Sequence, residues 1–110
     1  VARDPDFGPL LMFGLGGIYV EVLKDVSFRI APISKESALS MIQEIRSYPL
    51  LRGVRGEPPS DINAIADAIL RLSQLVTDFP QITELDVNPL RVMEAGKGAI
   101  AIDARVAVEV

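Results

Sequence analysis

Three polar side chains alternate with apolar ones in residues 82–90, which read ITELDVNPL. Residues two apart in a β-strand share a face, so Glu84, Asp86 and Asn88 are expected to point to the same side. Carboxylate and amide oxygens suit Mg²⁺, which takes one or two carboxylates plus waters and substrate phosphates. Pro89 bends or ends the strand directly after Asn88. The stretch is therefore a candidate magnesium site, or else the solvated face of an ordinary hairpin.

A second group of polar residues lies on the expected return arm of this hairpin, residues 99–108. Asp103 and Arg105 share one face of that arm. A turn formed by residues 94–98 would place Asn88 opposite Asp103, or within a pair or two of it. An amide oxygen and one or two carboxylates then meet on one face of two adjacent strands.

A glycine-rich stretch, residues 14–17 (GLGG), could bring backbone amides close to a phosphate. It is not a Walker A motif, because no Gly-Lys-Ser/Thr follows it, and Tyr19 stands where a dinucleotide fingerprint needs its third glycine. The alternative is that these glycines permit a bulge between two strands. Glu21 and Arg29 lie inside apolar strands and are either a phosphate-facing pair or the solvent side of a hairpin.

The composition excludes several kinds of chemistry. The 110 residues contain neither cysteine nor histidine, which excludes disulfides, thiol nucleophiles and a phosphohistidine on this chain. The net charge is −4 and the basic residues are scattered, which argues against a nucleic-acid partner. The longest uncharged run, residues 7–20, is shorter than the roughly 20 apolar residues of a membrane span. The N-terminus lacks signal-peptide features, so we expect a cytoplasmic protein.

The elements that position these residues are expected to form a single domain over residues 1–110. Residues 10–13 predict a short buried strand, and the alternation over residues 18–23 and 26–31 predicts an antiparallel hairpin. A second hairpin, whose outgoing arm is interrupted at Pro89, spans residues 82–108.

Two helices are expected between the hairpins. Ser34 is the predicted N-cap of the first, and Tyr48-Pro49 is predicted to stop it. Ser60 or Asp61 caps the second, whose apolar residues recur at helical spacing up to Phe79-Pro80. The order of elements predicts an α+β domain, with an antiparallel sheet and two helices on one face.

Four blocks of the sequence together resemble one family, in the order that the family has them. The chain is similar to the C-terminal part of the ATP-grasp domain of ADP-forming acyl-CoA synthetases (acetate–CoA ligases), and more distantly to the β subunit of succinyl-CoA synthetase. The resemblance implies the C-terminal lobe of an ATP-grasp fold, and the first residue, Val1, adds to the expectation of a piece of a longer polypeptide. The blocks are RDPDFGPLLMFGLGGIYVEVLKDVSFRIAP, LLRGVRGEPPSD, ELDVNPLRV and GAIAIDARV.

The family interconverts acyl-CoA, ADP and phosphate with the free acid, CoA and ATP, through a phosphohistidine on its CoA-ligase portion. The resemblance implies that Asn88 and Asp103 hold the Mg²⁺ that bridges the phosphates of ATP or ADP. Asp86 stands where relatives often have glutamate, so it would reach the metal only through water, and Arg105 would add a donor. The remaining residues implied at the edge of the nucleotide site are Gly14, Gly16, Gly17 and Glu21.

The resemblance also implies partners. The N-terminal ATP-grasp lobe and a CoA-ligase domain or subunit would supply the rest of the nucleotide site and the histidine, so no catalytic residue is expected on this chain and the isolated piece should be inactive. The alternatives are a regulatory or scaffold module of a multidomain acyltransferase, or an interaction domain that kept the fold and lost the site. The intact DVNPL and IDAR segments favour the ligase.

Overall fold

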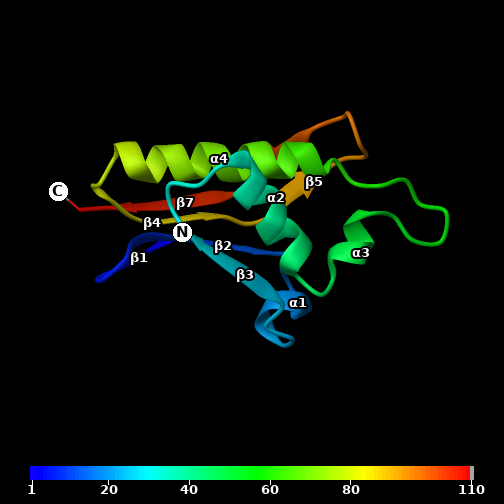
Figure 1. The fold of residues 1–110 in the computed structure, drawn as a ribbon, viewed down its shortest axis with the longest axis horizontal. Helices are drawn as coiled ribbons and strands as arrows, with labels where there is room; N and C mark the ends of the chain where they lie inside the picture. The colour runs from blue at the N-terminus through cyan, green and yellow to red at the C-terminus, as the bar shows by residue number, and fades with distance from the viewer. Residues whose placement is uncertain (110) are drawn as a thin grey trace.

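A computed structural model describes residues 1–109 of the chain (Figure 1). The chain has an α+β arrangement, with strands before and after a run of helices, as the sequence predicts. The elements in chain order are β1 (Ala2–Asp4), β2 (Gly8–Gly14), α1 (Ile18–Glu21), β3 (Val26–Ile30), α2 (Lys35–Glu44), α3 (Tyr48–Leu51), α4 (Ile62–Asp78), β4 (Ile82–Val87), β5 (Leu90–Val92), β6 (Ala99–Ala101) and β7 (Ala104–Val108).

Five strands form one antiparallel sheet in the order β3-β2-β1-β4-β7, and β5 and β6 form a separate two-stranded sheet. The first strand lies in the centre, where Ala2 pairs with Leu10 of β2 and with Glu84 of β4. The two sheets share one long hairpin, because β4 continues into β5 and β6 continues into β7. This confirms the predicted second hairpin and its interruption at Pro89.

Helices α2 and α4 pack against each other and cover the same face of the sheet (Figure 1). The Ser34 hydroxyl accepts a hydrogen bond from the Ser37 N–H, which confirms the predicted cap of α2. Asp61, and not Ser60, caps α4 by accepting from the Ala64 N–H. The residues most deeply buried between the helices and the sheet are Leu11, Ala38, Met41, Ile42, Ile65, Ala66, Val76 and Leu85.

The prediction of a strand over residues 18–23 is wrong. Gly16 and Gly17 have φ angles of 81° and 53°, which turn the chain into the single helical turn α1. The Val22 N–H donates to the Ile18 C=O at 3.1 Å and not to a neighbouring strand. The first hairpin is therefore β2 with β3, and α1 lies within its connection.

The prediction that Tyr48-Pro49 stops the first helix is also wrong. Helix α2 ends at Glu44, and the next residue, Ile45, is already extended with a ψ angle of 146°. Tyr48 and Pro49 instead begin the short helix α3, where the missing N–H of proline costs no hydrogen bond. Among residues 1–109, no helix has both the length and the apolar character that crossing a bilayer requires.

Candidate functional site

The predicted partners Asn88 and Asp103 lie at the junction between the two sheets. The Asn88 N–H donates to the Asp103 C=O at 3.0 Å, and the Ile102 N–H donates to the Pro89 C=O at 3.0 Å. The two residues are therefore directly opposite each other, within the range that the turn length predicts. Both are exposed, so their oxygen atoms are available to a ligand.

A second polar pair lies next to this junction. Asp86 on β4 pairs directly with Arg105 on β7, and both residues are exposed. Together with Asn88 and Glu84, they line a depression of about 670 Å³ on the sheet face that α2 and α4 leave uncovered. The shared face predicted from the alternation of residues 84, 86 and 88 is thus the face that lines this depression.

The remainder of the depression is apolar. Met12 of β2 and Phe28 of β3 line it while keeping 51% and 47% of their surface exposed. An open apolar floor beside amide, carboxylate and guanidinium groups can accommodate a ligand that has both a ring system and charged groups.

The glycine-rich loop reaches the same place. A Cβ atom added to Gly16 would lie 4.0 Å from the Asn88 Oδ1, so the loop between β2 and α1 borders the end of β4. Sequence reasoning gave these two features separately, and the fold brings them together. Glu21 lies at the end of α1, is exposed, and is not among the described residues that line the depression.

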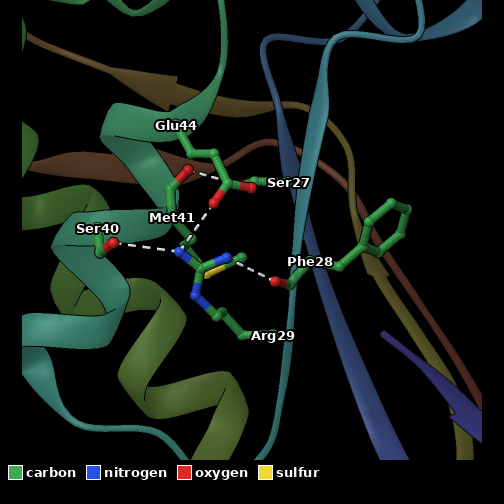
Figure 2. A network of polar contacts seen from close by, with 6 residues as sticks. All are labelled: Ser27, Phe28, Arg29, Ser40, Met41 and Glu44. Atoms are coloured by element: carbon green, nitrogen blue, oxygen red, sulfur yellow. Dashed lines mark hydrogen bonds and ion pairs between the residues drawn. The ribbon is translucent and has the colours of Figure 1, made fainter.

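Arg29 does not form a phosphate-facing pair with Glu21. Its guanidinium donates to Ser40 Oγ and to Glu44 Oε1 of α2, each at 3.1 Å, and to its neighbour's carbonyl oxygen, that of Phe28 (Figure 2). The side chain is therefore on the helix-covered face, where it joins β3 to α2. The sequence alone did not place Arg29 because its partner lies 15 residues away on another element.

Asp25 is a buried polar residue that the sequence reasoning did not single out. Its carboxylate accepts hydrogen bonds from the Ser47 hydroxyl, the Ser47 N–H and the Arg46 N–H. The Ser47 hydroxyl makes the largest contribution to lowering the pKa of Asp25, and the two backbone N–H groups add to it against the opposing effect of burial. Asp25 thereby ties the beginning of β3 to the connection between α2 and α3.

This lowered pKa predicts that Asp25 stabilises the fold in a pH-dependent way. A carboxyl with a depressed folded-state pKa contributes stability above its ordinary pKa of about 4, and this contribution is lost as the pH falls further. The Asp25→Asn variant is expected to unfold at a lower temperature than the wild type at pH 7, with the difference shrinking below pH 4. Thermal unfolding followed by circular dichroism from pH 7 to pH 3 measures it, and a pH-independent difference would contradict the assignment.

The donor set at the sheet junction fits magnesium. Within residues 1–109, no three acidic side chains converge to form a metal site by themselves. Asn88, Asp103 and Asp86 offer one amide oxygen and at most two carboxylates, which leaves positions for waters and phosphate oxygens. Mg²⁺ prefers such a mixed shell, whereas Ca²⁺ takes six to eight oxygen ligands.

The fold agrees with the comparisons to known proteins. The family model of the ATP-grasp domain matches residues 1–108, and the chain belongs to the ATP-grasp family. Among its relatives, the β subunit of ADP-forming acetate–CoA ligase I from Pyrococcus furiosus is 58% identical over 103 residues, 94% of this chain. ADP-forming acetate–CoA ligase I from Archaeoglobus fulgidus is 57% identical over 98 residues, 89% of this chain. The resemblance to ADP-forming acyl-CoA synthetases is thus confirmed.

A solved structure supports the same family assignment. The acetyl-coenzyme A synthetase 1 of Ca. Korarchaeum cryptofilum, in complex with coenzyme A and Mg-AMPPCP, superposes with a TM-score of 0.89 at 47% identity, covering 98% of this chain and 50% of that chain. Its phosphohistidine segment points towards the nucleotide-binding site. The present chain spans 44% of the Pyrococcus subunit and 14% of the Archaeoglobus ligase.

Proposed function

We propose that this chain forms the magnesium–nucleotide half-site of an ADP-forming acyl-CoA synthetase, which converts acyl-CoA, ADP and phosphate to the free acid, CoA and ATP. The observation that carries the proposal is the direct pairing of Asn88 with Asp103 at the sheet junction, beside Gly16. The Mg-AMPPCP in the Korarchaeum structure supports a nucleotide as the ligand.

Each residue at the junction would have a separate role in binding the phosphates. Asn88 and Asp103 would hold Mg²⁺ directly and Asp86 would do so through water, and the bound ion supplies charge neutralisation for phosphoryl transfer. Arg105 would donate hydrogen bonds to a phosphate oxygen, and the amides of Gly16 and Gly17 would border the same group. Phosphoryl transfer depends mainly on such positioning and electrostatic stabilisation.

The group that carries the phosphoryl would come from outside this chain, which contains no histidine. We assign that role to a CoA-ligase domain or subunit that presents a phosphohistidine to the exposed sheet face. The phosphohistidine segment of the Korarchaeum synthetase supports this assignment. The N-terminal ATP-grasp lobe would cover the apolar part of the depression and complete the nucleotide site.

Turnover by the complete enzyme tests the proposal. Arg105→Met is expected to raise the KM for ADP about 10- to 150-fold with a smaller change in kcat, since a charge-assisted hydrogen bond contributes roughly 1.5–3 kcal/mol. Initial rates of acyl-CoA consumption measure both constants. Arg71→Met is the matched control, because it removes an equally charged side chain whose partner is the exposed Asp67.

Two outcomes would contradict parts of this proposal. An unchanged KM in Arg105→Met would mean that the guanidinium does not contact the nucleotide. Absence of turnover in the wild-type complete enzyme, with Mg²⁺ and either ATP or ADP, would favour a regulatory module over a ligase.

A further inference from the structure

We propose that Asp61 is a positioning residue for the Asn88–Asp103 pair, in addition to capping α4. The inference rests on the proposed function, because it assigns Asp61 a part in holding the metal-binding hairpin in place. Asp61 lies outside the depression, so it would act through the hairpin without touching the ligand.

The carboxylate of Asp61 joins two elements at once. One oxygen, Oδ1, accepts from the Ala64 N–H at 3.1 Å in the first turn of α4. The other, Oδ2, accepts from the Gly98 N–H at 2.8 Å and from the Gly96 N–H at 3.1 Å, in the turn that connects β5 to β6. Asp61 is only 9% exposed, so these bonds are largely shielded from competing water.

Two glycines make this contact possible. Gly96 and Gly98 have φ angles of 86° and 85°, a region that residues with a Cβ atom rarely adopt. The turn can therefore aim two amides at a single carboxylate oxygen. The Gly98 amide, then the Ala64 amide, and more weakly the Gly96 amide hold the pKa of Asp61 below its usual range, against the effect of burial.

Backbone hydrogen bonds extend the same connection. The Asp61 N–H donates to the Met93 C=O at 2.8 Å, and the Ala95 N–H donates to the Pro59 C=O at 2.9 Å. Residues 59–61 thus run along residues 93–95 in a short seam. The Asp61 side chain adds hydrogen bonds to the turn itself, at Gly96 and Gly98.

This seam affects the site because it holds the hairpin close to the junction of the two sheets. β5 and β6 belong to the separate small sheet, and Asn88 and Asp103 lie at its junction with the main sheet. The main sheet holds the junction from one side, and the anchored turn holds it from the other. Without the Asp61 side-chain bonds, the turn would be held by the backbone seam alone. The relative placement of the Asn88 and Asp103 side chains would then loosen.

Two variants of Asp61 separate its two roles in the complete enzyme. Asp61→Ser keeps a good N-cap, but its shorter side chain cannot also reach Gly96 and Gly98. Asp61→Asn keeps an oxygen for Ala64 and turns an N–H₂ group towards the two glycine amides. Ser34→Ala is the control, since it removes a cap hydrogen bond that lies entirely within the first turn of α2.

The first measurement is hydrogen–deuterium exchange over residues 88–103, without metal or nucleotide. Faster exchange there in both Asp61 variants, but not in Ser34→Ala, is expected. The second is the Mg²⁺ concentration that gives half-maximal turnover, which is expected to rise about tenfold in the Asp61 variants and to stay unchanged in the control.

Unchanged exchange, or an unchanged Mg²⁺ requirement in an enzyme that Asp103→Ala inactivates, would overturn the inference. The proposed function fails differently. In that case Asp103→Ala stays active, while the Asp61 variants still loosen the hairpin.

Discussion

Replacement of Asp103 by alanine in the complete enzyme is expected to lower ligase turnover by about 10²–10³-fold or more, and Asn88→Ala is expected to do the same. Each change removes an oxygen ligand from the ion that would orient the nucleotide phosphates, and water cannot restore the same fixed geometry. The measurement is acyl-CoA formation with ATP and Mg²⁺, with wild type and variant assayed side by side.

The fold is expected to survive both substitutions. Asn88 and Asp103 are exposed, and their described link is a backbone hydrogen bond that alanine can also make. Tm should therefore stay close to that of the wild type. Asp67→Ala is the matched control, since it removes an exposed carboxylate from the solvent side of α4, where a surface ion pair contributes little. Full activity of Asp103→Ala would refute the metal assignment, and a lowered Tm would indicate a structural role.

The largest expected loss of stability comes from Ile42, which is completely buried between α2 and the sheet. Ile42→Ala is expected to lower the free energy of unfolding by about 2–5 kcal/mol, because it removes apolar contacts and leaves a cavity. That is a large share of the roughly 5–15 kcal/mol of a typical domain. Urea unfolding, monitored by circular dichroism, measures the change.

A graded series strengthens the Ile42 test. Ile42→Val removes one methylene and should cost about 0.5–1.5 kcal/mol, whereas Leu75→Ala on the exposed side of α4 should cost less than Ile42→Ala. Turnover per folded molecule should stay near the wild-type value in Ile42→Ala, since the side chain lies on the opposite face of the sheet from the depression. Equal destabilisation by Ile42→Ala and Leu75→Ala would show that the core is elsewhere.

The parts of the fold that sequence reasoning predicted correctly are those with strong local signals. The long apolar repeat and an acidic cap specify α4, and Ser34 specifies the beginning of α2. Residues 18–23 show why a local pattern can mislead. Their alternation suits a strand, but two preceding glycines with positive φ redirect the chain into a single helical turn.

Some contacts of the candidate site could likewise be predicted from the sequence, and others could not. The pairing of Asn88 with Asp103 could be predicted because turn length determines the register of a hairpin. The approach of Gly16 to Asn88 could not, because it depends on β1 lying between β2 and β4. The contacts of Asp25 with Arg46 and Ser47, and of Asp61 with Gly96 and Gly98, could not be predicted either, since these partners lie 21 to 37 residues further along the chain.

The central position of β1 has a consequence for the order in which the chain folds. Arg3 donates to the carbonyl groups of Val76, Phe79 and Ile82, which lie 73 to 79 residues further along the chain. During synthesis, the five-stranded sheet therefore cannot be completed until the last quarter of residues 1–109 has emerged from the ribosome. Contacts of such long range slow folding. The proposed nucleotide site, which depends on β4 and β7, would be the last part of the domain to form.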